Sequence, residues 1–436
     1  MADISPMGGK TTMEDISHDA ETATAIEKSM GLLEAIRKFP KAFDQRLGNL
    51  LPDGTYQLTA SWQSGLQNGT QVGQILGLLF AGLLAERFGY RKTLVGALFM
   101  TIGLIFLFFF AQNIGMLFAA EMLCGLPWGR FADANHHVCG RLNMCWVIGQ
   151  FLATGVLRGL LGRADNWAWR IPYAVQWVFP PFIIVGILFA PESPLWLVRK
   201  SRIEEAHKAL RKLISKSVSD TEIEQTVAMY VHTNALEKSF QEGTSYWDCL
   251  RGPNRRRTET ACCVWIAQVA CGIWYGGNVI YFLEQAGFDS EKAFDFGVGE
   301  IAIALVGTII AWFIIPRLGR RTLFLTGLTI MFTILMAVGF MGIPMIKPGL
   351  CWASGALMMV FVLSYDMTVG PVCYCLVAEI PSTRPRIKTV VLARNAYLIA
   401  SLVANFLNPP ILDPTAWNLR GKGGFIWAGI CLVILV

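Results

Sequence analysis

The chain has 436 residues, of which 54% are hydrophobic and 16% are charged. Soluble domains carry about 25% charged residues, so this composition argues against an ordinary soluble protein. The formal net charge is +6, but the cations gather in short loops beside apolar segments rather than in one basic domain. That distribution is typical of a chain whose partner is a lipid bilayer, and we expect no nucleic-acid partner.

Apolar segments long enough to cross a bilayer, for which roughly 17–25 residues are needed, recur along most of the chain. Residues 1–50 precede them, contain no apolar signal-peptide core, and are predicted to be a mostly disordered tail of cytoplasmic type. The eleven candidate segments are 62–85, 93–111, 115–131, 143–161, 171–190, 260–283, 295–315, 322–343, 350–378, 388–408 and 423–436. The sequence therefore predicts an all-α polytopic membrane protein.

Two charged turns indicate which side of the bilayer each loop occupies. The turn from Gly82 to Lys92 places three cations between two apolar segments, and the turn from Pro316 to Arg321 repeats this arrangement in the second half of the chain. Cations between spans mark the cytoplasmic face, and the acidic loop 284–295 is then external. Two halves with the same turn suggest a duplicated bundle, which is how many transporters are built.

A long cytoplasmic segment, 191–258, divides the chain into an N-terminal bundle, 51–190, and a C-terminal bundle, 259–436. Apolar residues recur at helical spacing in this linker, at Ile203, Ala206, Leu210, Leu213 and Ile214. We therefore expect amphipathic helices that lie against the cytoplasmic mouth of the bundles.

The alternation of sides requires segment 62–85 to run from outside to inside. Leu51 to Thr59 would then be external, so we expect one span to be missing between about Phe43 and Leu50. Two other places look incomplete. The apolar segment that reaches Gly129 passes abruptly into a polar loop, and the last segment has 14 residues, short of the ~20 that a span needs.

Polar side chains inside spans are costly unless they face a cavity or one another, so they are the candidate functional residues. Asn143 and Gln150 lie seven residues apart and share one helix face, whereas Gln268 and Asn278 lie ten apart and flank Trp274. Amides donate and accept hydrogen bonds, and aromatic rings pack on the apolar side of a sugar ring. The same amides could instead join helices, and composition alone leaves both interpretations open.

Three further positions in the spans are candidates. Tyr374 follows Gly370-Pro371, where a broken helix can open backbone groups to a site, and Glu121 and Arg394 are charges within spans. A carboxylate in an apolar environment can bind a proton near neutral pH, and a nearby guanidinium opposes that protonation. Separation of the two groups would then bind or release a proton. A static buried ion pair is the alternative.

The sequence contains no convincing motif for a nucleophile–base pair or a phosphate-binding loop. His136, His137 and Cys139 form one short cluster without a second pair, and we expect a solvated loop there rather than a metal site. We therefore predict no catalytic residue, no metal and no cofactor, and the protein is not expected to be an enzyme.

Several stretches match the motifs of one family: Gly82–Lys92, Trp146–Phe151, Pro191–Val198, Gly319–Arg321, Val369–Glu379, Lys388–Asn395 and Asn408–Trp417. The chain resembles major facilitator superfamily sugar porters, and within them the fungal maltose/α-glucoside permeases, over residues 51–129 and 143–436. The resemblance implies a two-bundle fold with about 11 of 12 spans present. It also implies symport of maltose or another α-glucoside with a proton, by alternating access. We expect a monomer in the plasma membrane.

The chain departs from the family pattern in places. The first span, with a Glu-Gly-Tyr-Asp motif, is absent, Arg130–Arg141 replaces most of the segment that joins spans four and five, and the closing motif after span twelve is cut off. In the seventh span Val269 stands where the family has a second Gln, and Trp274 where it has an Asn. This departure fits a site rebuilt for a larger glycoside.

The resemblance assigns roles residue by residue, with Asn143 and Gln268 matching amides that bind sugar in the family. The expected substrate-binding residues are Asn143, Gln150, Gln268, Trp274, Asn278, Tyr374 and Asn395, and the expected proton-coupling residues are Glu121 and Arg394. The expected gating residues, which would close the inner face, are Glu86, Arg87, Arg91, Glu192, Arg320, Arg321, Glu379 and Arg384. The alternative for these charges is that they only set which side of the membrane each loop occupies.

A transporter-like sugar sensor and a truncated permease without function are the rival interpretations of the chain, and a membrane enzyme is a remote third.

Overall fold

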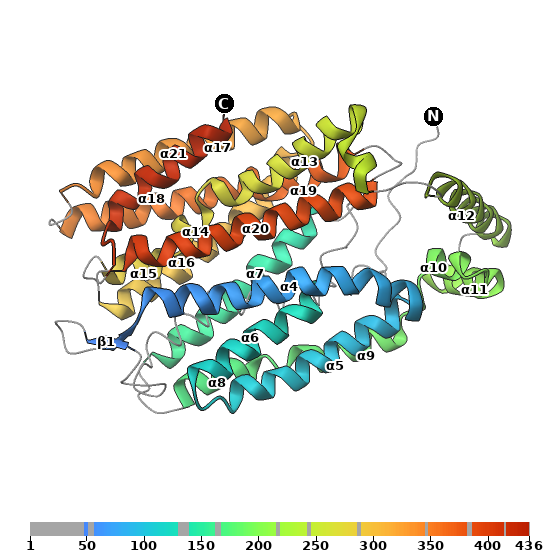
Figure 1. Cartoon of the computed structure of the whole chain (residues 1–436), viewed down its shortest axis with the longest axis horizontal. Coiled ribbons are helices and arrows are strands. Elements are labelled where there is room, and N and C mark those ends of the chain that lie inside the picture. Colours follow the sequence, from blue (N-terminus) through green and yellow to red (C-terminus); the bar gives the residue numbers. More distant parts are fainter. Residues whose placement is uncertain are drawn as a thin grey trace.

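The computed structural model describes residues 48–50, 56–129, 139–161, 167–214, 219–241, 246–285, 289–344, 348–381, 386–413 and 416–435. Within these ranges the chain is helical apart from a short hairpin, in which β1 (Gly48–Leu50) pairs antiparallel with β2 (Tyr56–Leu58). The hairpin is a small departure from the all-α prediction. It lies at the opposite end of the molecule from the linker helix α12 (Asp220–Gln241), as expected for an external segment (Figure 1).

The N-terminal bundle follows the predicted spans closely. Its helices are α4 (Ala60–Phe88), α5 (Tyr90–Phe109), α6 (Ile114–Gly129), α7 (Cys139–Leu160), α8 (Trp167–Val175) and α9 (Phe179–Phe189). The linker contributes α10 (Pro194–Arg199), α11 (Ile203–Leu213), α12 and the 3-10 turn η3 (Tyr246–Leu250). The polar loop expected after Gly129 lies outside the described residues.

The C-terminal bundle comprises α13 (Gly252–Ala270), α14 (Ile273–Gly276), α15 (Val279–Gln285), α16 (Ser290–Ile314), α17 (Arg320–Met341), α18 (Pro348–Met367), α19 (Val369–Glu379), α20 (Arg386–Leu412), η4 (Arg420–Lys422) and α21 (Gly423–Leu435). Seven of the described helical segments are long and apolar enough to cross a bilayer, and two shorter apolar helices, Ile114–Pro127 and Val147–Leu160, accompany them. Each of the eleven predicted spans coincides with helix in the described residues.

Three spans predicted as continuous are broken. Segment 171–190 divides into α8 and α9, segment 260–283 into α13, α14 and α15, and segment 350–378 into α18 and α19. The first break in segment 260–283 occurs at Gly272, whose φ of 89° lies in the left-handed region that glycine adopts without a steric penalty. The break between α18 and α19 falls at Thr368. The sequence analysis expected a broken helix at Gly370-Pro371, two residues after Thr368, but did not predict the other breaks.

The linker helices pack chiefly on one another. Leu197 of α10 and Ala206 of α11 are buried in one small core, and Leu210 of α11 is buried with Ile223 of α12 in a second. Ile203, expected on the buried stripe, is instead 49% exposed, because α11 begins there and its first turn projects beyond α10. The amphipathic helices are confirmed, and Figure 1 places them together beyond one end of the helical bundles.

The two bundles meet mainly along two helix pairs, with a smaller contact between α7 and α19. Helix α4 packs against α20, and α7 packs against α16 (Figure 1). Exposed aromatic residues face outward from the bundles, for example Phe182 and Phe189 on α9 and Phe313 on α16. Such surfaces suit hydrocarbon and would be unfavourable in water. The two-bundle membrane fold is therefore confirmed.

Helices α4 and α6 approach at glycines. A Cβ on Gly73 would lie 2.1 Å from the carbonyl oxygen of Met122, and a Cβ on Gly125 would lie 2.3 Å from that of Thr70. These positions admit no side chain, because two backbones occupy the space. Small residues at helix crossings permit this close packing in membranes, where no hydrophobic effect drives helices together.

We predict that Gly73→Ala destabilises the N-terminal bundle, because its methyl group forces α4 and α6 apart at a cost of about 1–3 kcal/mol. The midpoint of thermal unfolding of the detergent-solubilised protein should fall by several degrees. Gly96→Ala on α5 is the matched control, since a Cβ there meets no atom within 4 Å. Equal midpoints for the two variants would contradict the proposed crossing.

Candidate functional site

An aromatic cluster in the C-terminal bundle surrounds one cation. The ring of Trp265 on α13 lies edge-on to Tyr374 of α19 and to Tyr397 of α20, at 5.0 Å in both cases. The guanidinium carbon of Arg394 lies 4.8 Å from the Trp265 ring centre and 4.6 Å from that of Tyr397. Cation–π attraction of this kind stabilises a guanidinium away from water. The expected residues Tyr374 and Arg394 thus belong to one cluster, together with Trp265 and Tyr397, which the sequence analysis missed.

Several buried polar atoms next to this cluster have no hydrogen-bond partner among the described residues. They include the amide oxygens of Gln268 and Asn395 and the indole nitrogens of Trp265 and Trp274. Most buried polar groups in folded proteins are paired, because an unpaired one costs about 1–3 kcal/mol. Donors and acceptors held on α13, α14 and α20 are therefore available to a polar ligand.

The broken helix after α13 arranges its own polar groups locally. The side-chain amide of Asn278 donates to the carbonyl oxygen of Trp274, one turn earlier. Tyr275 is fully buried, and its hydroxyl donates to the carbonyl oxygens of Arg420 at 2.8 Å and Gly421 at 3.3 Å. The structure therefore uses one amide hydrogen of Asn278 to close the break and fastens α14 to the turn η4.

The N-terminal bundle carries the remaining expected polar residues. Gln150 is half-buried on α7, and Asn143 lies on the same helix, although its side chain is outside the described residues. Helix α4 adds Asn68 and Gln71, whose buried amide atoms include some without a partner in the described part of the chain. Asn68 and Gln71 lie inside the predicted span 62–85, so the rule that selected Asn143, a polar side chain within a span, would also have selected them.

Glu121 and Arg394 lie in different bundles. Glu121 of α6 is 1% exposed, and one of its carboxylate oxygens accepts a hydrogen bond from the hydroxyl of Thr70 on α4. Arg394 rests between aromatic rings on α20, and the ion pairs formed by the described residues do not include one between the two groups. Their role in proton coupling stays a prediction.

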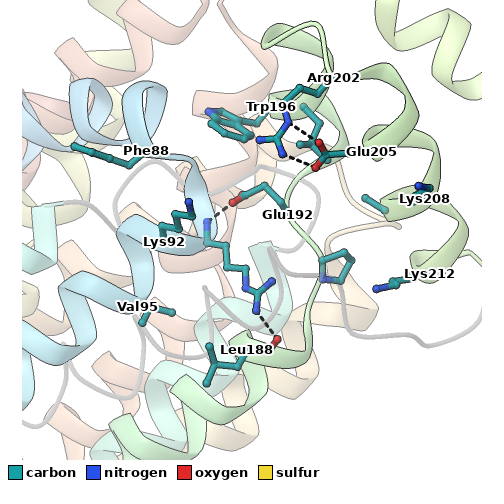
Figure 2. A pocket seen from close by; sticks show the side chains of 14 residues that line it. Phe88, Lys92, Val95, Leu188, Glu192, Trp196, Arg202, Glu205, Lys208 and Lys212 are labelled. Atoms are coloured by element: carbon teal, nitrogen blue, oxygen red, sulfur yellow. Dashed lines mark hydrogen bonds and ion pairs between the residues drawn. The ribbon is translucent and has the colours of Figure 1, made fainter.

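The inner ends of the bundles carry the expected gating charges. Glu192 accepts hydrogen bonds from the backbone N–H groups of Arg91 at 3.0 Å and Ser193 at 3.3 Å, while the Arg91 guanidinium donates to the carbonyl of Leu188 at 2.6 Å (Figure 2). In the other bundle Arg320 pairs with Glu379 at 3.0 Å. Each contact lies within one bundle, joining the start of α5 to the end of α9 or the start of α17 to the end of α19.

The other expected gating residues either form no such contact among the described residues or lie outside them. The guanidinium of Arg87 lies over the neighbouring Phe88 ring at 5.6 Å, and Arg321 is exposed. The side chain of Glu86, together with Arg384 and the pair His136-His137, lies outside the described residues.

An ion pair at the other end of the molecule joins the two bundles. Arg158 of α7 pairs with Asp295 of α16 at 2.6 Å and with Glu291 of the same helix at 3.6 Å. The sequence analysis had placed Asp295 and Glu291 in an external acidic loop but had not assigned Arg158 a partner. This contact closes the outer ends of α7 and α16 on one another.

The long apolar helices and the seam between the two sets of helices define a two-bundle helical membrane fold. Among solved structures, the fold is similar to that of the MFS (major facilitator superfamily) proton:xylose symporter XylE bound to 6-bromo-6-deoxy-D-glucose. The TM-score is 0.76 at 18% identity, over 97% of this chain and 94% of that one. A partially occluded inward open form of the xylose transporter XylE from E. coli gives a TM-score of 0.74, over 97% of each chain.

Sequence comparisons identify the family. The model of the sugar (and other) transporter family matches residues 17–436. A maltose permease of Saccharomyces cerevisiae is 34% identical over 97% of this chain and 76% of the permease, and a general alpha-glucoside permease of that yeast is 32% identical over 96% and 75%. The chain belongs to the sugar (and other) transporter family and is a multi-pass membrane protein.

We predict that Arg158→Gln loosens the outer ends of α7 and α16. The pair is partly exposed, so solvent weakens it and we expect a small effect. Hydrogen–deuterium exchange of the outer turns of both helices should accelerate modestly. Arg255→Gln is the control, since Arg255 pairs with Glu259 within α13. If exchange in Arg158→Gln equals that of the unaltered protein, the ion pair does not hold the outer ends of α7 and α16 together.

Proposed function

We propose that the protein carries maltose or a related α-glucoside across the plasma membrane together with a proton. The observation that carries the proposal is the set of buried, unpaired amide and indole groups on α13, α14 and α20. Sugar hydroxyls are both donors and acceptors and can pair with Gln268, Asn395 and Trp274 at once. The printed names of the yeast relatives, maltose permease and general alpha-glucoside permease, support this class of substrate.

The aromatic groups supply the second half of sugar recognition. Tyr374 and Trp265 present ring faces and edges beside the unpaired amides, and such rings pack on the apolar C–H face of a sugar. Arg394 holds Trp265 and Tyr397 in place by its position between their rings. Asn143 and Gln150 on α7 would approach the sugar from the opposite bundle, so that the ligand lies between the two halves.

Transport then follows from rocking of the bundles about the seams α4–α20 and α7–α16. With the Arg158–Asp295 pair formed, the outer ends of α7 and α16 are closed. When that pair separates and the inner ends approach, the site is exposed to the outside. Contacts such as Arg320–Glu379 keep each inner helix pair together as one body during this motion. The sugar site is thus accessible from only one side of the membrane at a time.

Glu121 is the proposed proton carrier. Its carboxyl group is buried on α6, next to the Thr70 hydroxyl on α4, and α4 forms one seam with the opposite bundle. Protonation removes a charge whose burial is costly and changes the hydrogen bond to Thr70. A carboxyl placed on the helix pair next to a moving seam can therefore link protonation to the position of the bundles.

The substrate site is tested with Gln268→Ala. Loss of one hydrogen-bonding group should weaken maltose binding, and thus raise KM for uptake, about tenfold. Uptake of labelled maltose is measured in cells that lack other maltose uptake, with Gln225→Ala on the exposed face of α12 as the control. Unchanged binding in Gln268→Ala would show that the site is misplaced, and binding without uptake by the unaltered chain would favour a sugar sensor.

The proton carrier is tested with Glu121→Gln, which keeps the shape of the side chain and cannot ionise. Maltose added to energised cells should cause external alkalinisation with the unaltered chain, because protons enter with the sugar. Glu121→Gln should abolish the alkalinisation while exchange of labelled maltose across the membrane persists. Alkalinisation that survives the substitution would exclude Glu121 as the carrier.

A further inference from the structure

A pocket of about 660 Å³ lies at the inner end of the N-terminal bundle, apart from the proposed sugar site (Figure 2). It is bounded by the start of α5, the segment from the end of α9 into α10, and the linker helix α11. Val95, Leu188 and Trp196 give it apolar walls. The transport mechanism described above makes no use of this space.

The pocket is strongly positive. Five cationic side chains and two carboxylates line it, an excess of three positive charges. Both carboxylates are already engaged. Glu205 is held by Arg202 through two hydrogen bonds of 2.8 and 2.5 Å, and Glu192 accepts the backbone N–H of Arg91. The excess charge is therefore not neutralised by the walls of the pocket themselves.

Three lysines carry most of this excess. Lys92 comes from α5, and Lys208 and Lys212 lie one turn apart on α11. None of the three forms an ion pair with another residue that the structure describes. Figure 2 shows the Lys212 ammonium group turned toward the interior of the pocket. Like charges gathered around a concave surface raise its potential and attract an anion.

We propose that this pocket binds a phosphomonoester group. Such a group carries about −1.5 to −2 charge at pH 7 and offers several strong acceptor oxygens. The three ammonium groups and the guanidinium N–H groups of Arg91 not donated to Leu188 match both properties. A single carboxylate would neutralise less of the excess. The apolar walls accommodate the small organic group that carries the phosphate.

The ligand would hold the linker against the transport bundle. It would lie between Lys92 on α5 and Lys212 on α11, which line opposite sides of the pocket (Figure 2), and its negative charge would attract both elements. Its site adjoins the contact between Arg91 and Glu192 that joins the inner ends of α5 and α9. A cytoplasmic ligand bound in the pocket would thus affect the position of helix ends that move during transport.

Two sources could present the phosphomonoester. One is a soluble phosphate ester in the cytoplasm. The other is the headgroup of a phosphorylated inositol lipid, because Leu188 in the pocket is next to Phe189, which is 86% exposed on the lipid-facing side of α9. Basic pockets at the cytoplasmic surface of membrane proteins bind such headgroups. Both sources share the chemistry that the lysines recognise.

The test uses the full chain in phosphatidylcholine nanodiscs. In one arm glycerol 3-phosphate is titrated by calorimetry, with glycerol as the uncharged counterpart. In the other arm the thermal unfolding midpoint is compared between nanodiscs that contain phosphatidylinositol 4-phosphate and nanodiscs that contain phosphatidylinositol, which has only a phosphodiester. The variant is Lys92→Gln/Lys212→Gln, and the matched control, Lys200→Gln/Arg251→Gln, removes two exposed cations outside the pocket.

We expect a response to the phosphomonoester in at least one arm, and at least about tenfold weaker binding, or loss of the midpoint shift, in the pocket variant alone. A response to glycerol 3-phosphate identifies a soluble ligand, and a response confined to phosphatidylinositol 4-phosphate identifies a lipid. No response in either arm, or equal loss in the control variant, would overturn the proposal. Maltose uptake by the pocket variant verifies that this variant folds. This control is separate from the measurement of phosphomonoester binding.

Discussion

The cost of an unpaired polar group inside a bilayer governs this structure. In hydrocarbon a backbone amide finds no water, so a spanning chain must satisfy its own hydrogen bonds as a helix. Three spans depart from this rule: the one divided into α8 and α9 lies in the N-terminal bundle, and those broken between α13 and α15 and between α18 and α19 lie in the C-terminal bundle. Asn278 restores part of the bonding by donating to the Trp274 carbonyl. Gln268 and Asn395 keep buried amide oxygens without a partner among the described residues, an arrangement that a polar ligand or a bound water molecule would stabilise.

The same constraint explains how the two bundles are held. Within the N-terminal bundle the contacts are close, as at Gly73 and Gly125, where a Cβ would meet the backbone of the facing helix. Between bundles the described contacts run mainly along α4–α20 and α7–α16, with a smaller contact of α7 with α19, and the ion pair of Arg158 with Asp295 is partly exposed to solvent. A strong interior and an adjustable seam are what a rocking motion requires, because the bodies must stay rigid while their mutual position changes.

Much of this architecture could be predicted from the sequence, because it follows from composition and charge. Long apolar runs located the helices, cationic turns gave their orientation, and the stripe at Ala206 and Leu210 gave the linker helices. Gly370-Pro371 indicated the break that falls at Thr368, whereas the breaks at Gly272 and between α8 and α9 were not predicted, because continuous apolar segments were expected there. Nor could the surroundings of Arg394 be predicted, because the rings of Trp265 and Tyr397 reach it from separate helices and only the fold brings them together. A charge within a span suggested a carboxylate partner, yet aromatic faces can stabilise a guanidinium as well.

Tyr275 has a consequence for communication through the membrane. Its hydroxyl fastens the single-turn helix α14 to the carbonyls of Arg420 and Gly421, just before α21, and its ring is fully enclosed. Trp274, the neighbouring residue, presents an unpaired indole nitrogen to the interior. A cargo that draws Trp274 inward must therefore pull the η4 turn with it. Through Tyr275, the short helix α14 thus connects the interior residue Trp274 to the turn that precedes the last described helix, α21.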